Sequence, residues 1–204
     1  MNVYNHPLLQ GHTIDCDPYI TTRSYKKDEI IHVEGETCDE LSLVIQGDIS
    51  IYTYTYYENE YAIAHLEKDG LFGQFLIFAD DPVYLGNVVS LSNATIIIIK
   101  RVNLLELLTK DKQVLTNFLR ISSNSVLNIQ NRVKILSQKS IKESIMFYFE
   151  EIIKKTKTNV IFVKSKERLA EYLNIPRPSL SRALIELKAL GIIEINGKYI
   201  TIKE

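Results

Sequence analysis

The chain has 204 residues, of which 46% are hydrophobic and 24% charged, and its formal net charge is −1. This apolar content is enough to bury one large or two modest cores, which excludes a largely disordered chain. The sequence shows no signal peptide and no apolar run long enough to span a membrane, so we expect a cytoplasmic protein with no membrane partner.

The charge is distributed unevenly along the chain. Residues 1–137 carry 11 basic and 17 acidic side chains, a net of −6, whereas residues 138–204 carry 13 basic and 8 acidic ones, a net of +5. A basic C-terminal portion is typical of a nucleic-acid-binding domain joined to a domain that does not touch nucleic acid. The two cysteines, Cys16 and Cys38, have no metal-ligand spacing and favour a reduced chain.

The first half of the chain has the pattern of a β-protein. Residues 1–24 are expected to form a short helical or irregular lead-in. Short apolar runs at 30–33, 41–45, 49–54, 61–64 and 87–99 then alternate with glycine-containing or acidic turns. Strands at such regular spacing indicate a sandwich or barrel.

Two helices are expected after these strands, a short one at 103–108 and a long one at 111–137. Apolar residues and one serine recur along the long helix at alternating spacings of four and three, which is a heptad seam. A seam this narrow favours a partner helix over packing on the chain's own strands. The seam residues are Leu115, Leu119, Ser122, Val126, Ile129, Val133 and Leu136.

The C-terminal portion reads as helices around a short turn, followed by a hairpin. Ser140 and Glu143 form a capping box that begins one helix, residues 160–163 form a strand, and Ser165 caps the next helix. Two prolines interrupt the pattern, and Pro178 suits the first turn of a new helix. That helix ends at Gly191.

A hairpin with Asn196-Gly197 as its turn then completes a winged helix-turn-helix, whose second helix enters a DNA major groove. We expect three side chains of this helix to read base edges: Arg177, Ser181 and Arg182. We expect five polar or basic residues to contact phosphates: Ser165, Lys166, Ser179, Asn196 and Lys198.

Several motifs resemble the Crp/Fnr family of bacterial transcription regulators. They are Lys26 to Ile31, Glu34-Gly35-Glu36, Leu43 to Asp48 and Gly70-Leu71-Phe72-Gly73, followed by the winged helix in the right order. The resemblance implies an α+β chain with an N-terminal β-roll (a double-stranded β-helix or jelly roll). The expected domains are a cyclic-nucleotide-binding-like sensor at 1–110, a dimerisation helix at 111–137 and a DNA-binding domain at 138–204. Its implied partners are double-stranded DNA with an inverted-repeat operator, a second copy of the chain and RNA polymerase.

The effector pocket that the resemblance implies is degenerate. Relatives that bind cyclic AMP use a glutamate for the ribose and an arginine for the phosphate. Here Gly73-Gln74-Phe75 and Tyr84-Leu85 stand at those motifs, with Ile129 and Gln130 on the long helix. An anionic phosphate without a cation is costly to bury, so we expect no response to cyclic AMP.

Other cofactors and functions have little support in the sequence. An iron–sulfur cluster needs about four thiolates, and His32 and His65, the candidate haem ligands, read as surface histidines. Cys38 reads as a small, semi-buried side chain. Five tyrosines from Tyr52 to Tyr61 read as cross-strand packing, with an aromatic ligand site as the alternative. No catalytic motif is visible, so we expect no enzyme. Three alternatives stay open: a regulator with an unidentified small-molecule effector in the β-roll, a regulator that needs no ligand, and a β-roll subunit that does not bind DNA.

Overall fold

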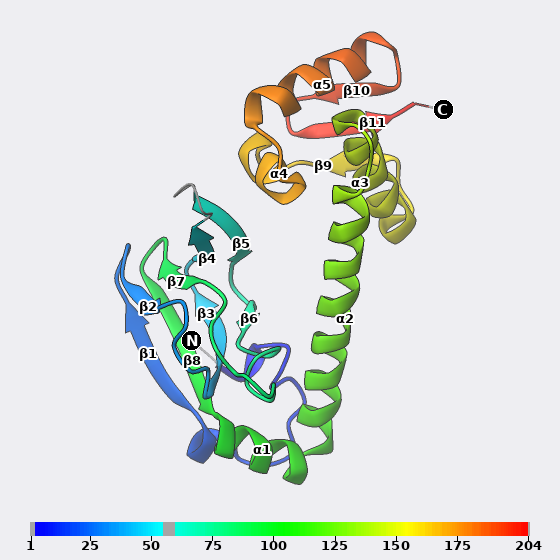
Figure 1. The fold of residues 1–204 in the computed structure, drawn as a ribbon. Helices are drawn as coiled ribbons and strands as arrows, with labels where there is room; N and C mark the ends of the chain where they lie inside the picture. Colours follow the sequence, from blue (N-terminus) through cyan, green and yellow to red (C-terminus); the bar gives the residue numbers. More distant parts are fainter. Residues whose placement is uncertain (1–2, 55–59, 204) are drawn as a thin grey trace. The chain divides into compact units, whose positions relative to one another are not determined.

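The computed structural model describes residues 3–54 and 60–203 and has an α+β fold (Figure 1). The chain forms two compact units, residues 1–124 and 125–204. The division between them lies inside the long helix α2 (Lys112–Leu136), which the sequence predicts as a segment of its own. Each unit has its own hydrophobic core.

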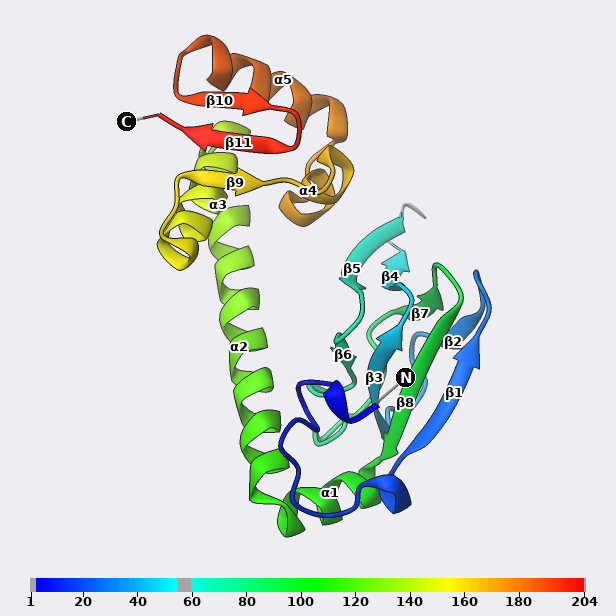
Figure 2. The same cartoon turned by 180° about the vertical axis from the view of Figure 1, so that it is seen from behind.

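Two four-stranded antiparallel sheets make up the β-roll of the first unit (Figures 1 and 2). One sheet has the order β1-β8-β3-β6 and the other β2-β7-β4-β5. The strands are β1 (Thr21–Tyr25), β2 (Ile30–His32), β3 (Glu40–Gln46), β4 (Ile49–Tyr54), β5 (Glu60–Leu66), β6 (Leu71–Phe72), β7 (Asn87–Ser90) and β8 (Ala94–Lys100). The predicted β-roll is therefore confirmed.

The prediction of a single strand at 87–99 is wrong, because a turn divides this segment into β7 and β8. Side chains on the two sides of this turn hold it in place: the Ser90 hydroxyl donates to the Ser92 carbonyl at 2.6 Å, and the Asp48 amide donates to Ser92 Oγ at 3.0 Å. The chain therefore passes from one sheet to the other here. The strands β1 and β6 were not predicted, since Thr-Thr-Arg-Ser-Tyr is polar and Leu71–Phe72 is very short.

The N-terminal lead-in contributes more to the core than its sequence suggests. It contains two short 3₁₀ helices, η1 (Val3–Asn5) and η2 (Asp17–Tyr19), and Leu8 and Leu9 between them are fully buried in the β-roll core. Polar side chains of the α2 region hold its backbone. The Asn117 side chain donates to the carbonyls of Leu8 and Gln10 at 3.1 and 2.8 Å.

Helix α1 (Arg101–Lys110) follows β8 directly, and both predicted helices are present with shifted ends. Asp111 separates α1 from α2. One of its carboxylate oxygens accepts hydrogen bonds from the Gln113 and Val114 amides at 2.8 and 3.1 Å, which caps the start of α2. The other accepts from the Thr13 amide at 2.5 Å, so the same side chain also fastens the lead-in.

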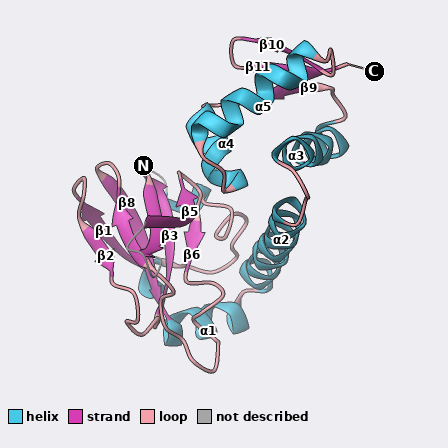
Figure 3. Ribbon diagram, turned by 45° about the horizontal axis from the view of Figure 1, so that its top comes forward, coloured by secondary structure: helices cyan, strands magenta, loops and turns pink. Residues whose placement is uncertain are grey.

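The second unit combines helices with a three-stranded sheet of order β10-β11-β9 (Figure 3). Its elements are α3 (Ile141–Thr156), β9 (Val160–Phe162), α4 (Lys166–Leu173), α5 (Arg177–Ala189), β10 (Ile193–Asn196) and β11 (Tyr199–Ile202). Ser140 caps α3 as predicted, with its Oγ accepting from the Glu143 amide at 3.2 Å. Among the helices of the described residues, none is both long and apolar enough to cross a membrane.

We expect Leu8→Ala to lower the free energy of unfolding by about 2–5 kcal/mol, because it removes a fully buried side chain from a packed core. Leu91→Ala is the matched control, since Leu91 is exposed and its loss should change the free energy by about 0.5 kcal/mol or less. Urea unfolding of both variants measures the difference. Equal effects would mean that the lead-in is not part of the folded core.

Candidate nucleic-acid interface and effector pocket

Helix α4 begins where the sequence predicts. Ser165 Oγ accepts a hydrogen bond from the Arg168 amide at 3.1 Å, which satisfies one of the free donors at the helix start. Leu169, Ala170 and Leu173 are buried, so this helix has one face in the core. Its first residues, Lys166 and Glu167, remain exposed at the positive end of the helix dipole.

A tight turn then reverses the chain into α5. Asn174 ends α4 in the left-handed conformation, with φ of 53°, and its amide donates to the Glu171 carbonyl at 3.1 Å. Pro176 is the residue before α5, and Pro178 lies in its first turn, where its missing amide leaves no helical hydrogen bond unmade. The two predicted helices about a short turn are therefore confirmed.

One face of α5 is buried and the opposite face is open. The buried residues are Leu180, Ala183, Leu184 and Leu187. Arg182 is exposed on the other side, whereas Ser181 and Ser179 are half-buried at the flanks. The hydrophobic side chains thus fix the rotation of the helix about its axis, and that rotation decides which polar groups can reach a ligand.

Two exposed ion pairs involve α5. Arg177 Nη1 lies 3.1 Å from Glu167 Oε1 of α4, and Lys142 Nζ of α3 lies 2.6 Å from Glu186 Oε2. Exposed pairs of this kind contribute little to stability and exchange readily. Arg177, predicted to read bases, therefore has a carboxylate partner within its own unit.

The hairpin turn differs by one position from the prediction. Asn196 belongs to β10 and pairs with Tyr199, so the two turn residues are Gly197 and Lys198 instead of Asn196-Gly197. Of the two turn residues only Gly197 has a positive φ, 59°, which is the pattern of a type II′ turn with glycine first. Lys198 is exposed at the tip of this wing.

A hollow of about 250 Å³ lies between the wing and the start of α4. It brings together three of the predicted phosphate contacts, Ser165, Lys166 and Lys198. Ser179 and Asn196 do not line it. Lys164 does, and the sequence signal that could have found it is its place directly before the N-cap serine. Three lysines around one helix start make this hollow attractive to an anion.

The predicted effector residues of the β-roll lie in contrasting surroundings. Gly73 follows β6 with φ of 87°, and a Cβ there would lie 2.5 Å from the Glu40 carbonyl oxygen, so this position requires glycine. Gln74 is half-buried, whereas Phe75 and Leu85 are exposed. Ile129 and Gln130 are exposed on the part of α2 that belongs to the second unit.

Tyr84 lies in the interior of the β-roll. Only 3% of it is exposed, and its ring stacks on the imidazole of His32 with 4.1 Å between the ring centroids. Burial and the neighbouring Cys38 thiol raise the pKa of Tyr84, and burial also raises the pKa of Cys38. The prediction of a semi-buried Cys38 is wrong, because Cys38 is fully buried, and His32, predicted at the surface, is half-buried against this tyrosine.

His32 belongs to a chain of charges at the same place. Its Nε2 lies 3.2 Å from Glu40 Oε1, and Lys100 Nζ lies 2.7 Å from Glu40 Oε2. Burial would raise the pKa of Glu40, but hydrogen bonds from His32 and Lys100 outweigh it and lower the pKa to about 2. Two basic side chains near the β-roll interior, His32 and Lys100, therefore each lie against the carboxylate of Glu40.

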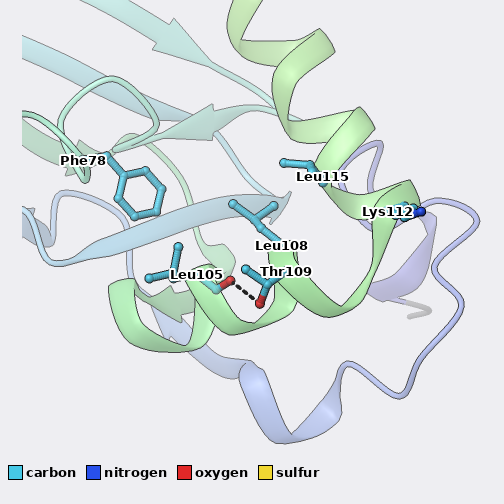
Figure 4. A pocket seen from close by; sticks show the side chains of 6 residues that line it. All are labelled: Phe78, Leu105, Leu108, Thr109, Lys112 and Leu115. Carbon is cyan, nitrogen blue, oxygen red and sulfur yellow. Dashed lines mark hydrogen bonds between the residues drawn. The ribbon is translucent and has the colours of Figure 1, made fainter.

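The first unit has three further features that bear on a binding site. Figure 4 shows an apolar hollow of about 400 Å³, lined by Phe78, Leu105, Leu108, Thr109, Lys112 and Leu115, and none of the predicted effector residues lines it. Asp48, His65 and Glu67 lie close enough to one another to hold a metal ion, but exposed acidic groups often cluster in this way where no ion binds. Of the tyrosine-rich hairpin, Tyr56 and Tyr57 lie outside the described residues, while Tyr52 and Tyr54 meet edge to face at 5.6 Å.

Most of the predicted seam of α2 is exposed. Leu119, Val126, Ile129, Val133 and Leu136 are exposed, and Leu115 and Ser122 are half-buried. Ile129 and Val133 expose 52% and 60% of their surface. A row of apolar side chains along one helix therefore faces solvent in the single chain.

Acid titration tests the Glu40 network. Because the pKa of Glu40 is lowered from 4.5 to about 2 on folding, its contribution to stability is present above pH 4.5 and is lost as the pH falls towards 2. We expect the wild type to lose about 1–2 kcal/mol more than Glu40→Gln over this range, after allowance for solvent screening. Urea unfolding at several pH values measures it, and identical pH profiles would contradict the network.

Two family models match the chain. The model described as "Cyclic nucleotide-binding domain" matches residues 22–111, and that described as "Crp-like helix-turn-helix domain" matches residues 151–204. Together they cover more than two thirds of the sequence. No curated protein matches it significantly.

Solved structures share the fold. FixK2 from Bradyrhizobium japonicum is 20% identical, with a TM-score of 0.63, over 91% of this chain and 93% of that one. The catabolite activator protein of Thermus thermophilus is 18% identical, with a TM-score of 0.57, over 97% and 94%. CprK complexed with OCPA is 14% identical, with a TM-score of 0.75, over 92% and 88%.

At such identities the structural likeness concerns the fold, and the two family models add the domain types in their order along the chain. A β-roll that matches the cyclic nucleotide-binding domain precedes a winged helix that matches the Crp-like helix-turn-helix domain. The chain therefore belongs to the Crp/Fnr family of DNA-binding transcription regulators.

Proposed function

We propose that this regulator binds an inverted-repeat operator as a homodimer and that cyclic AMP is not its effector. The observation that carries the DNA-binding part is the open face of α5, with Arg182 exposed on it and the lysine-lined hollow beside the wing. A helix of this kind lies in the major groove, with base contacts that begin at its N-terminal residues. RNA polymerase is a further partner in this proposal.

Arg182, Ser181 and Arg177 are the proposed base-reading residues. Arginine suits a two-pronged contact with guanine O6 and N7, which gives about 1–3 kcal/mol of discrimination. Arg182 is exposed and ready to make it. Arg177 must first give up Glu167, so its contact depends on exchanging an exposed ion pair.

Ser165, Lys166, Ser179, Asn196 and Lys198 are the proposed phosphate contacts. The hollow that Ser165, Lys166 and Lys198 line supports the grouping, because a phosphate there would meet lysine ammonium groups and the start of α4 together. Such contacts position the protein without reading sequence. Lys164 joins this set from the structure.

The exposed seam of α2 supports the homodimer. Exposed apolar side chains at heptad spacing are stabilised when a second helix buries them, and in a parallel two-fold pair each residue meets its own copy. A two-fold dimer would present its recognition helices to half-sites about 34 Å apart. The interface requires no bound ligand.

The absence of a response to cyclic AMP rests on the residues at the family's pocket. Tyr84 stands where the phosphate-neutralising arginine of the family is expected, and its ring occupies the interior. The nearby Lys100 is paired with Glu40 and Asp39. A phosphate at this position would therefore lack the cation that the family's arginine supplies, and it is costly to bury without one. We likewise propose no iron–sulfur cluster and no haem: Cys16 and Cys38 are both buried, and His32 is engaged with Glu40.

We expect Arg182→Ala and Lys198→Ala to weaken binding in different ways. Arg182→Ala should lower the ratio of operator to random-DNA affinity about 5- to 150-fold, because it removes a base contact. Lys198→Ala should weaken both alike and reduce the salt slope by about one unit, because it removes a phosphate contact. Fluorescence anisotropy across a salt series measures both.

The comparison of Arg182→Ala with Lys198→Ala distinguishes a base-reading residue from a phosphate contact. An unchanged affinity ratio in Arg182→Ala would contradict its base-reading role, and a sequence-selective loss in Lys198→Ala would make the wing a base reader. Retained thermal stability in both variants excludes unfolding as the cause, since both side chains are exposed.

We expect Ile129→Asp to convert the dimer into monomers, because it places two like charges opposite each other in the seam. Asn124→Asp is the control, since this exposed position lies on the face of α2 away from the seam. Sedimentation equilibrium of both variants measures the association. If Ile129→Asp stays a dimer as stable as the control, the interface lies elsewhere.

A further inference from the structure

The outermost face of α5 is more apolar than a DNA-reading surface requires. The four buried side chains place the centre of the buried face, and at 100° per residue the opposite line runs through Pro178, Arg182, Ile185 and Ala189. All four are exposed. Arg182 is the only one among them that can make a hydrogen bond through its side chain.

Ile185 is the large apolar side chain on this line, and 64% of it is exposed. It is not needed for the core, which Leu184 and Leu187 fill from the other side of the helix. It lies three residues after Arg182, a rise of about 4.5 Å along the helix, slightly more than one base step of about 3.4 Å. The two side chains can therefore meet neighbouring base pairs.

Two polar side chains near Ile185 lie off the line opposite the buried face. At 100° per residue, Ser181 and Glu186 each lie about 70° away from this line, on opposite sides of it. Pro178 offers no side-chain hydrogen bond. The side-chain chemistry that this face presents beside Arg182 is thus apolar.

We infer that Ile185 determines specificity by contacting the C5-methyl group of a thymine. This inference rests on the proposed function, namely that α5 enters the major groove. The thymine methyl is the one apolar group on the major-groove edges of the standard bases, and an apolar side chain is its natural partner. The operator half-site then pairs a guanine, read by Arg182, with a thymine one or two base steps away.

Replacement of thymine by deoxyuridine tests this directly, because it removes only the methyl group. An operator is first selected from random duplex DNA with the wild-type protein, and each thymine of one half-site is then replaced in turn. In the wild type, one replacement should weaken binding about fourfold, the value of one buried methyl group. In Ile185→Ala the same replacement should cost nothing, because the contact is already absent.

Leu190→Ala is the matched control, since Leu190 is equally exposed, at 65%, but follows the last turn of α5 off this face. It should bind like the wild type and keep the deoxyuridine effect. The inference is overturned if every replacement is neutral in the wild type, or if the cost persists in Ile185→Ala. A selection that enriches no sequence contradicts the base-reading proposal itself, whereas an enriched operator with dispensable methyl groups contradicts this inference alone.

Discussion

The burial of one face of α5 is the constraint on which the DNA-binding unit depends. Leu180, Leu184 and Leu187 pack into a core shared with α3, α4 and the wing, and this packing fixes the helix about its axis. Each such side chain contributes roughly 1.5–3 kcal/mol on burial, far more than the exposed ion pairs around it. The outward set of side chains is a consequence of this packing, and recognition follows from that set.

In the β-roll, side-chain packing determines which groups lie in the interior. Its interior is occupied by Tyr84, stacked on His32, with Cys38 fully buried beside it. Glu40 lies between His32 Nε2, at 3.2 Å, and Lys100 Nζ, at 2.7 Å. The family model for this domain is named for cyclic nucleotides, and its interior holds a buried aromatic side chain and a glutamate paired with Lys100.

The elements that rest on periodicity and capping could be predicted from the sequence. Ser140, Ser165 and Pro178 mark helix starts through local chemistry, and the structure places them there. The burial of Leu8, the break between β7 and β8 and the interior position of Tyr84 depend on residues distant in the chain, such as Asn117 and Asp48. The outward position of Ile185 could not be predicted from the sequence, because it follows only once the buried face of α5 is known.

Operator affinity with and without cyclic AMP tests the central claim, that this family member binds DNA without the nucleotide. The measurement uses the full-length protein and the operator selected from random DNA, with cyclic AMP raised to millimolar concentration. Because a ligand can act only through different affinities for two states, a protein that does not bind cyclic AMP should show an unchanged dissociation constant for the operator. A gain in affinity of tenfold or more, about 1.4 kcal/mol of coupling, would contradict the account.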